Sequence, residues 1–428
     1  MKLNLLKNKK ILILGLGREG ESSFQFLRKQ FPKKIIGLAD KLTFNKLPLS
    51  IQRLIKKDKK IKLFLGGKYL ESIKNYDIVI KTPGISRKLL LPYLAKQKIT
   101  SQTEIFLEKY KNQTIGITGT KGKGTTANLI YKIFKDNKIE AEMIGNMGKP
   151  ALDFWKNKKT KKLFIFELSS HQLENLKISP HIAIFLNIYP DHLDYFKDFK
   201  EYFKAKTNIT KWQKENDYFI FNDSFSEIKN LAKKSKAKKI RFETKKSKDY
   251  FLCNKLASKA VSSLFKISSE NIKKSEINLK TIEHRLEFVG KFNGIYFYND
   301  SAATIPEATI AALNFLKNVE TLILGGSEKG SDFQTLTKTM INKKIKTVIL
   351  FPEKGKKMWQ EISKQGKKNL PEHFFVNKMD EAVRLCFKQA RKGSACLLSP
   401  ACASFTSFEN YQDRGNQFKK YIKEFAKK

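Results

Sequence analysis

Short apolar runs alternate with longer amphipathic stretches over the whole chain, a pattern typical of parallel sheets whose strands are joined by helices. Buried strands are predicted at residues 11–14, 35–39, 77–81, 115–117, 163–168, 181–188, 321–324, 347–351 and 396–399. Helices are expected at residues 21–30 and 196–209, with a long lysine-rich helix at the carboxyl end. The pattern therefore predicts an α/β fold with doubly wound sheets.

The alternation restarts twice, near Ser101 and near Glu283. A chain of 428 residues is also too long for one ordinary core, so two or three domains are expected. These restarts divide the chain into residues 1–100, 101–282 and 283–428. The highly charged run at residues 233–248 is expected to be a solvated surface.

Residues 114–126, TIGITGTKGKGTT, join a predicted strand to a predicted helix through a glycine-rich loop. Backbone N–H groups in such a loop, together with the amino end of the helix, bind phosphate. Lys123 is expected to reach the outer phosphates of ATP, and Thr125 to offer a hydroxyl to Mg²⁺. Ile117 and Gly124 depart from the usual pattern, and a flexible surface turn is the competing interpretation. The predicted ATP-binding loop is Gly119, Thr120, Lys121, Gly122, Lys123, Gly124, Thr125 and Thr126.

The first strand-to-helix turn, at residues 15–20, reads GLGREG and fits the G-x-G-x-x-G pattern of a nucleotide diphosphate site. Asp40 follows the next strand, where such folds place an acid on the ribose. Residues 81–86, KTPGIS, are expected to form a turn at the end of a third strand, on the same edge of the sheet as this site. A Pro-Gly pair is often a turn without a binding role. The pattern indicates a diphosphate-bearing nucleotide and does not specify NAD.

Acidic and histidine side chains follow two of the central strands. Glu167 ends the strand at residues 163–168, where it would hold Mg²⁺ beside the phosphates or else cap a helix. His192 lies in a turn of ligand-type residues, PDHLD, although a lone histidine is more often structural. Lys206, from the residues alone, is one surface lysine among many.

Ordered motifs over nearly the whole chain resemble those of the Mur ligases. They are GLGREG, TPGIS, GITGTKGKGTT, GNMG at 145–148, FELSSHQLE, NIYPDHLDYF with a downstream AK, EHRLE at 283–287, NDSAAT at 299–304, LGGSEKG at 324–330 and SPACAS at 399–404. SPACAS with the trailing FENYQDRG at 408–415 is most similar to the branch that adds D-glutamate to UDP-N-acetylmuramoyl-L-alanine.

That resemblance implies a Rossmann-like UDP-substrate domain, a central P-loop-type ATPase domain and a C-terminal Rossmann-like domain that brings the amino acid. It implies an ATP-dependent ligase of peptidoglycan precursor and cell-wall synthesis, linked to cell shape and division. ATP would convert a carboxylate into an acyl phosphate, which the D-glutamate amine then attacks. The implied cofactors are ATP, two Mg²⁺ ions and a CO₂-derived carbamate on Lys206.

The resemblance also assigns roles to single residues. The residues with implied catalytic roles are Lys123, Glu167, His192, Lys206 and Lys329. The implied metal ligands are Glu167, His192 and carbamylated Lys206, in addition to the hydroxyl of Thr125. Further ATP contacts fall on Asn254, Arg285 and Asp300, and D-glutamate contacts on Thr304, Lys329, Ser404 and Tyr411. UDP-substrate contacts fall on Gly17, Arg18, Glu19, Asp40, Thr82, Pro83, Gly84 and Asn146. The chain departs from the family pattern at Gly124, Ala302, Ile305 and Ser327.

The formal net charge of +44 favours a nucleic-acid partner at first sight. Only 9 of the 85 basic residues are arginine, however, and the lysines are scattered through nearly every segment. The scatter indicates a compositional bias, with nonspecific adhesion to polyanions at low salt. Four cysteines without a CxxC pair, no signal-peptide order and no apolar span of ~20 residues predict a cytoplasmic protein without a membrane partner. A monomer is expected, although these features do not determine the oligomeric state.

Three other functions compete with this one. A folylpolyglutamate synthase shares the Gly-Lys-Gly order but lacks the UDP-binding domain that about a hundred residues provide here. A dehydrogenase would rest on G-x-G-x-x-G alone and leave residues 114–126 unexplained. A nucleic-acid-binding protein would rest on net charge alone. Small-molecule substrates, UDP-N-acetylmuramoyl-L-alanine and D-glutamate, are the expected partners.

Overall fold

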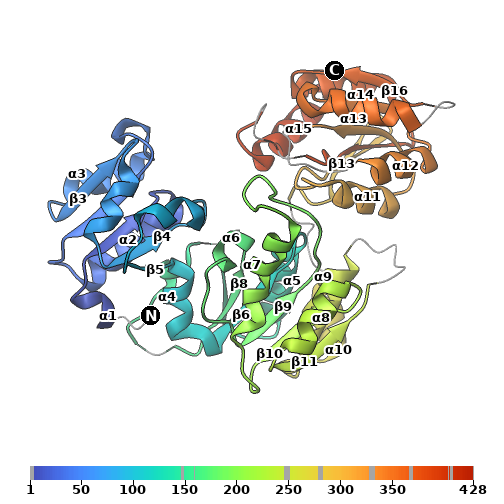
Figure 1. Cartoon of the computed structure of the whole chain (residues 1–428). Helices are drawn as coiled ribbons and strands as arrows, with labels where there is room; N and C mark the ends of the chain where they lie inside the picture. Colours follow the sequence, from blue (N-terminus) through green and yellow to red (C-terminus); the bar gives the residue numbers. More distant parts are fainter. Residues whose placement is uncertain are drawn as a thin grey trace. The chain divides into compact units, whose positions relative to one another are not determined.

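A computed structural model describes residues 4–145, 149–158, 160–244, 251–277, 283–326, 333–365, 370–402, 404 and 408–427 (Figure 1). The chain forms two compact units. The first comprises Met1–Tyr189, Lys200–Thr244 and Cys253–Ile277, and the second Pro190–Phe199, Lys245–Leu252 and Asn278–Lys428. The first unit carries two sheets and the second unit one, and the three-domain boundaries stay a prediction.

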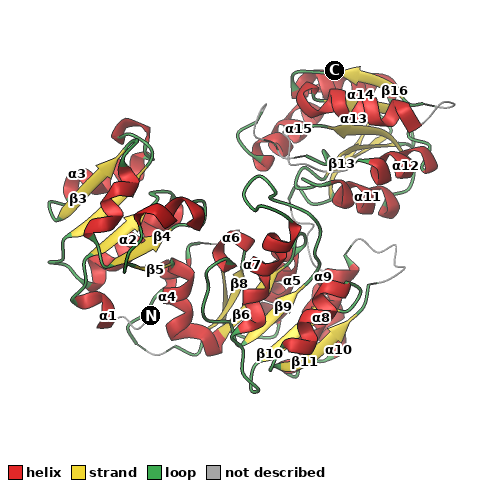
Figure 2. Ribbon diagram, viewed as in Figure 1, coloured by secondary structure: helices red, strands yellow, loops and turns green. Residues whose placement is uncertain are grey.

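The first sheet is parallel throughout, with five described strands in the order β3-β2-β1-β4-β5 (Figure 2). Its strands are β1 (Ile11–Leu14), β2 (Ile36–Asp40), β3 (Ile61–Leu65), β4 (Ile78–Lys81) and β5 (Lys98–Thr100). The helical segments are α1 (Asn4–Lys7), α2 (Arg18–Gln30), η1 (Phe44–Lys46), α3 (Leu49–Lys57), η2 (Tyr69–Asn75) and η3 (Arg87–Tyr93). The apolar pattern missed β3, because this edge strand is half exposed and carries Lys62 on its open side.

The second sheet is also parallel, with six described strands in the order β11-β10-β9-β6-β8-β7. Its strands are β6 (Thr114–Thr118), β7 (Ala141–Gly145), β8 (Leu163–Glu167), β9 (Ile182–Phe185), β10 (Tyr218–Asn222) and β11 (Lys238–Phe242). The helical segments are α4 (Gln102–Tyr110), η4 (Lys111–Gln113), α5 (Lys123–Asp136), η5 (Ala151–Phe154), α6 (Ser170–Leu173), α7 (Phe199–Lys211), α8 (Ser226–Lys234), α9 (Leu252–Leu264) and α10 (Ser269–Ile277).

Most charged side chains of the run at residues 233–248 that the structure describes are exposed, as expected of a solvated surface, but the run also contains a strand that the pattern did not predict. That run contains β11, an edge strand whose outward side chains are exposed lysine and arginine. Residues 245–248 lie outside the described residues. Charge on an edge strand discourages pairing with another chain, and it also hides the strand from a hydrophobicity pattern.

The third sheet has the order β12-β13-β17-β14-β15-β16 in the described residues, with β12 antiparallel to β13 and the other pairs parallel. Its strands are β12 (Glu287–Phe292), β13 (Ile295–Asn299), β14 (Val319–Leu324), β15 (Thr347–Leu350), β16 (Glu372–Phe375) and β17 (Ala395–Leu398). The helices are α11 (Pro306–Phe315), α12 (Gln334–Asn342), α13 (Pro352–Gln365), α14 (Met379–Gln389) and α15 (Tyr411–Phe425).

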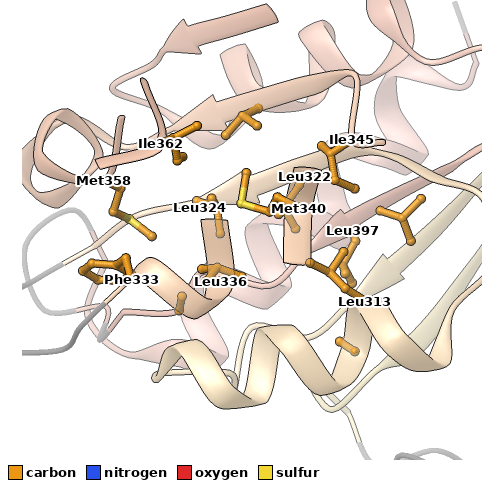
Figure 3. Close-up of a cluster of buried hydrophobic side chains, with 14 of the residues drawn as sticks. Leu313, Leu322, Leu324, Phe333, Leu336, Met340, Ile345, Met358, Ile362 and Leu397 are labelled. Carbon is orange, nitrogen blue, oxygen red and sulfur yellow. The ribbon is translucent and has the colours of Figure 1, made fainter. Parts of the chain in front are cut away.

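Helices cover both faces of this third sheet, because its central strands are apolar on each side. Leu322 and Leu324 of β14 belong to the cluster under α11, α12 and α13, which Figure 3 shows. Ile323, between them, belongs to the cluster under α14 and α15. Burial of each such side chain contributes roughly 1.5–3 kcal/mol. The doubly wound α/β prediction is confirmed, and such sheets bind ligands at the carboxyl ends of their strands.

None of the described helices has both the length and the apolar character that crossing a membrane requires.

Candidate functional site

The glycine-rich loop joins the carboxyl end of β6 to the amino end of α5. Gly122 caps α5 in the left-handed conformation at φ +86°, and a Cβ there would lie 2.7 Å from Nδ2 of Asn254. Gly119 has φ +152°, and a Cβ there would lie 3.0 Å from Cβ of Leu186. Both positions therefore require glycine. The helix begins at Lys123, two residues before the threonines predicted to open it, so Thr125 lies in its first turn.

Asn187, two residues after the end of β9, holds one side of the loop. Its Oδ1 accepts from the N–H of Lys121 at 2.9 Å, and its Nδ2 donates to the carbonyl of Lys121 at 3.0 Å. Its own carbonyl accepts from the N–H of Thr120 at 3.1 Å. Asn187 was not among the predicted site residues, although its position near the carboxyl end of the strand predicted at residues 181–188 was an available signal.

Asn254 of α9 braces the other side of the loop. Its Nδ2 donates to the carbonyl of Gly122 and to Oγ1 of Thr126, both at 2.9 Å. The structure thus places this predicted ATP contact against the loop itself. Lys123 lies across the loop, because its Nζ donates to the carbonyls of Gly119 and Thr120 at 3.0 and 3.2 Å. Asn187 and Asn254 thus hold the loop in shape, which is the kind of preorganisation that favours phosphate binding.

Glu167 is the last residue of β8 and lies in register with Ile117 of β6. The residue is only 4% exposed, and its Oε2 has no hydrogen-bond partner among the described residues. A buried carboxylate oxygen without a partner is costly and calls for an explanation. A bound cation would supply one, since oxygen is the ligand atom that Mg²⁺ prefers.

Lys206 lies on the buried face of α7 and is 1% exposed, so the surface-lysine interpretation is wrong. Its Nζ donates to the carbonyl of Gly119 at 3.0 Å and to Oγ1 of Thr118 at 3.4 Å. The same Thr118 hydroxyl donates to the carbonyl of Leu168, next to Glu167. The structure thus links Lys206, the start of the phosphate loop and the end of β8 through one threonine.

His192 lies in a tight turn of the second unit, with a left-handed backbone at φ +56°. Its N–H donates to Oδ1 of Asp191 at 3.0 Å, and its Nε2 lies 3.8 Å from Oδ2 of the same residue. Its role as a metal ligand stays a prediction. Among the described residues, no group of three or more His, Cys, Asp or Glu side chains is placed to hold a metal.

The G-x-G-x-x-G turn of the first sheet is closely packed. A Cβ at Gly20 would overlap the carbonyl of Gly15, so α2 lies directly against the turn. Asp40 holds the turn with both oxygens: Oδ2 accepts from the N–H of Leu16 at 2.7 Å, and Oδ1 from the N–H of Leu42 at 2.9 Å. The structure therefore gives this predicted ribose ligand a bracing role as well. Gly17 caps α2, Arg18 begins it, and both are exposed.

Glu19 follows in the first turn of α2 with a buried carboxylate. Its Oε1 accepts from Nε2 of Gln172 at 2.7 Å, whereas its Oε2 has no partner. Burial raises the pKa of Glu19, against the opposing effects of Gln172, Lys81 and Arg18. The bond to Gln172 joins the first sheet's α2 to the second sheet's α6.

The turn after β4 contains Thr82, Pro83 and Gly84, three predicted UDP-substrate contacts. Thr82 donates to the carbonyl of Leu14 through its N–H at 3.0 Å and its hydroxyl at 3.1 Å. Lys81 closes the turn, because its Nζ donates to the carbonyls of Thr82 and Ile85 at 3.1 and 2.6 Å. Burial lowers the pKa of Lys81, and the nearby carboxylates of Glu174 and Glu19 partly oppose this effect by raising it. Asn146 lies outside the described residues.

In the second unit, Arg285 sits between two residues with left-handed backbones, His284 at φ +65° and Leu286 at φ +49°. Such conformations are strained in residues other than glycine and persist only where neighbours hold them. Oδ1 of Asp300 accepts from the N–H of Leu286 at 3.1 Å, and Oε2 of Glu287 accepts from the N–H of His284 at 2.9 Å. The structure thus presents this predicted ATP contact on a braced turn.

Arg414 of α15 is fully buried, at 0% exposure, and the sequence analysis assigned it no role. Burial lowers its pKa to about 10, against Cys402 and Asp300. Its neighbours carry the predicted D-glutamate contacts: Ser404 is buried, Thr304 is half-buried and Tyr411 begins α15. Lys329 and Ser327 lie outside the described residues.

Many nucleotide-binding enzymes have a glycine-rich phosphate loop on a parallel α/β sheet, so the fold alone does not identify the protein family. Comparison with known sequences does. Residues 117–305 match the Mur ligase middle domain, and residues 284–402 match the Mur ligase, glutamate ligase domain. A Clostridium botulinum UDP-N-acetylmuramoylalanine–D-glutamate ligase is 33% identical, with 98% of this chain and 97% of the relative covered. The chain belongs to the Mur ligase family.

Solved structures share the fold at lower identity. MurF ligase from Thermotoga maritima in complex with ADP has a TM-score of 0.61 at 14% identity, with 100% of this chain and 99% of that chain covered. MurC from Thermotoga maritima has a TM-score of 0.58 at 16% identity, with 98% of this chain and 100% of that chain covered.

A second sequence relative, a UDP-N-acetylmuramoylalanine–D-glutamate ligase from Caldicellulosiruptor bescii, is 32% identical, with 98% of each chain covered.

Proposed function

We propose that this chain is an ATP-dependent ligase that joins D-glutamate to UDP-N-acetylmuramoyl-L-alanine in peptidoglycan precursor synthesis. The observation that carries the proposal is the braced phosphate loop beside two buried ionisable groups, Glu167 and Lys206. Identity of 33% to a ligase of that name, over 98% of the chain, supports the substrate pair.

The reaction needs a carboxylate to become an electrophile. A carboxylate oxygen of UDP-N-acetylmuramoyl-L-alanine attacks the γ-phosphorus of ATP, ADP leaves, and an acyl phosphate forms. The D-glutamate nitrogen then attacks the acyl carbon, gives up a proton and expels phosphate. Negative charge builds on oxygen in each step, so Lys123 and the amino end of α5 are the stabilising groups in the first unit. Lys329 is proposed for the same role.

Mg²⁺ fits the residues at the end of β8. Glu167 offers a buried oxygen without a partner, and Thr125 offers a hydroxyl in the first turn of α5. Mg²⁺ commonly takes one or two carboxylates together with substrate phosphates, and it would neutralise phosphate charge there. His192 is proposed as a further ligand, and two ions are proposed in all.

A carbamate on Lys206 also fits. The amine is nearly inaccessible and contacts the carbonyl of Gly119 and the hydroxyl of Thr118. Burial disfavours a charged ammonium in general, and the neutral amine is the form that adds CO₂. The product is an anion that would hold Mg²⁺ close to the phosphate loop.

The remaining assignments are proposals on the same footing. Arg285 and Asp300 would face the nucleotide. The amino acid would contact Thr304, Ser404 and Tyr411, and the UDP group would bind at the GLGREG and TPG turns. In Asp300 and Asp40 the carboxylates also hold backbone N–H groups, so each would act partly by shaping a turn. We further propose that the enzyme is a cytoplasmic monomer that serves cell-wall growth and division, which sedimentation and localisation experiments would test.

The decisive experiment is phosphate release from ATP by the full chain. Release should require UDP-N-acetylmuramoyl-L-alanine, D-glutamate and Mg²⁺ together, and omission of any one should reduce it to background. Release that requires a folate and L-glutamate instead would identify a folylpolyglutamate synthase. No ATP consumption with both cell-wall substrates would refute the proposal.

A further inference from the structure

Three segments of the second unit that lie far apart in sequence meet at the side chain of Arg414. Its Nε donates to Oγ of Ser301 at 3.0 Å, and its second terminal nitrogen donates to the carbonyls of Ser301 and Cys402 at 2.8 and 3.2 Å. The Ser301 hydroxyl in turn donates to the carbonyl of Tyr411 at 2.8 Å. One guanidinium thus joins the turn after β13, the loop after β17 and the start of α15.

Each of these segments carries one predicted D-glutamate contact. Thr304 follows Ser301 in the same turn, Ser404 follows Cys402 in the same loop, and Tyr411 lies one helical turn before Arg414. We propose that Arg414 is a positioning residue that holds these amino-acid-binding segments in register and so sets the affinity for D-glutamate. This inference rests on the proposed function and assigns to Arg414 a role that acts through the segments it bonds.

The geometry explains why the residue is arginine. Its fixed planar fork directs several N–H groups toward acceptors on different segments, whereas a lysine offers one compact ammonium. Its acceptors include two main-chain carbonyls and a hydroxyl inside the protein, where an unfilled acceptor is costly. The guanidinium therefore fixes the spacing of the segments as well as their proximity.

The next residue along α15 restricts the helix start from its other side. A Cβ at Gly415 would overlap Nδ1 of His284, and Nδ2 of Asn299 lies 2.9 Å from the same ring nitrogen. The turn that presents Arg285 is braced by Asp300 and Glu287. Asp300 and Glu287 accept from N–H groups of the turn that presents Arg285, whereas Arg414 donates to Ser301 and Cys402, which predicts that Arg414 affects D-glutamate binding more than ATP binding.

The test is a steady-state comparison of four proteins: wild type, Arg414→Lys, Ser301→Ala and Arg391→Lys. Arg391 is an exposed arginine of the same unit, paired with Glu320, and is the matched control. We expect Arg414→Lys to raise the KM for D-glutamate about tenfold, since sub-ångström misplacement of binding groups is enough for such losses. The KM values for ATP and UDP-N-acetylmuramoyl-L-alanine should stay within about twofold of wild type. Arg391→Lys should change none of them.

Ser301→Ala keeps the arginine and removes the hydroxyl that links it to Tyr411, so it should raise the same KM by about threefold. It decides the question if Arg414→Lys does not fold. An unchanged KM for D-glutamate in the folded variants overturns the inference. So does a fall in kcat, with all three KM values unchanged, that parallels a fall in Tm, because this is what lost stability alone produces. A wild-type enzyme without substrate-dependent phosphate release refutes the proposed function instead.

Discussion

Two fully buried basic residues, Lys206 in the first unit and Arg414 in the second, occupy comparable positions near the carboxyl ends of the strands of their sheets. Both donate to main-chain carbonyls, but their surroundings differ. Lys206 is linked through Thr118 to the carbonyl of Leu168, and the preceding residue, Glu167, has an Oε2 without a hydrogen-bond partner in the part of the chain that the structure describes. Beside Arg414, Asp300 has both oxygens bonded, to the N–H of Leu286 and the hydroxyl of Ser399.

This difference distinguishes a site suited to catalysis from one suited to holding the structure. A lysine can lose its proton and be modified, whereas an arginine stays charged and holds several acceptors at once. Open coordination capacity near Lys206 predicts that substitutions there reduce turnover more than stability. Filled hydrogen bonds near Arg414 predict the reverse, with losses in stability and in substrate affinity. Four substitutions, in order of expected effect, test the contrast.

Lys206→Arg should have the largest effect, a loss of about 10³-fold or more in kcat. Arginine keeps a positive charge and cannot form the proposed carbamate. Phosphate release measures the loss, and a ¹³C carbamate signal after ¹³C-bicarbonate labelling should disappear with it. Lys204, exposed on the same helix, gives the control Lys204→Arg, which should keep both. Full activity in Lys206→Arg would rule out the carbamate.

Glu167→Gln should lower kcat by about 10²-fold and raise the Mg²⁺ concentration needed for half-maximal activity. Because Oε2 has no protein partner, Tm should stay at or above the wild-type value. Magnesium titrations and thermal unfolding measure the two effects. A marked drop in Tm without a change in magnesium dependence would make Glu167 a structural acid.

Thr125→Ala should raise the half-maximal Mg²⁺ concentration about tenfold, as loss of a single metal-oriented group does. Thr126→Ala provides the comparison, because its hydroxyl accepts from Asn254 and supports the loop. That variant should weaken ATP binding instead. Intact magnesium dependence in Thr125→Ala would show that the hydroxyl next to Gly124 is not a metal ligand.

Glu19→Gln should have the smallest effect and should depend on pH. Burial raises the pKa of Glu19 above its ordinary 4.5, so the folded protein holds this proton more tightly than the unfolded chain. The protonated carboxyl therefore contributes to the free energy of unfolding below pH 4.5, and this contribution is lost as the pH rises through the pKa of the folded state. Glutamine avoids the loss, so Tm should rise by roughly 1–3 °C at pH 7.5, more than at pH 4.5. Equal shifts at both pH values would contradict this explanation.

The phosphate loop and Glu167 were predictable because a strand, a glycine loop and an acid at a strand end leave local patterns. Lys206 was not recognised from the residues alone, because a lysine-rich chain hides one buried lysine. A usable signal was present: Lys206 shares the buried face of α7 with Tyr202 and Ile209, at helical spacing.

Long-range bracing was the part that sequence could not supply. Asp40 fits a ribose ligand by position, yet its oxygens bond to backbone N–H groups that only the folded turn brings near. Arg414 shares the buried face of α15 with Phe418 and Ile422 at helical spacing, but the acceptors that it bonds on other segments leave no local pattern. The helices α2 and α5 also begin earlier than predicted, because their glycines cap them directly.

The lysines on β3 and β11 have a consequence for how the protein behaves at high concentration. Exposed sheet margins normally attract the same margin on another molecule, and here they carry charge of one sign on a molecule with a formal net charge of +44. Mutual repulsion keeps copies apart at low ionic strength, but the Debye length falls to about 3 Å in 1 M salt. Concentrated salt should therefore favour self-association, whereas dilute buffer should favour adhesion to polyanions.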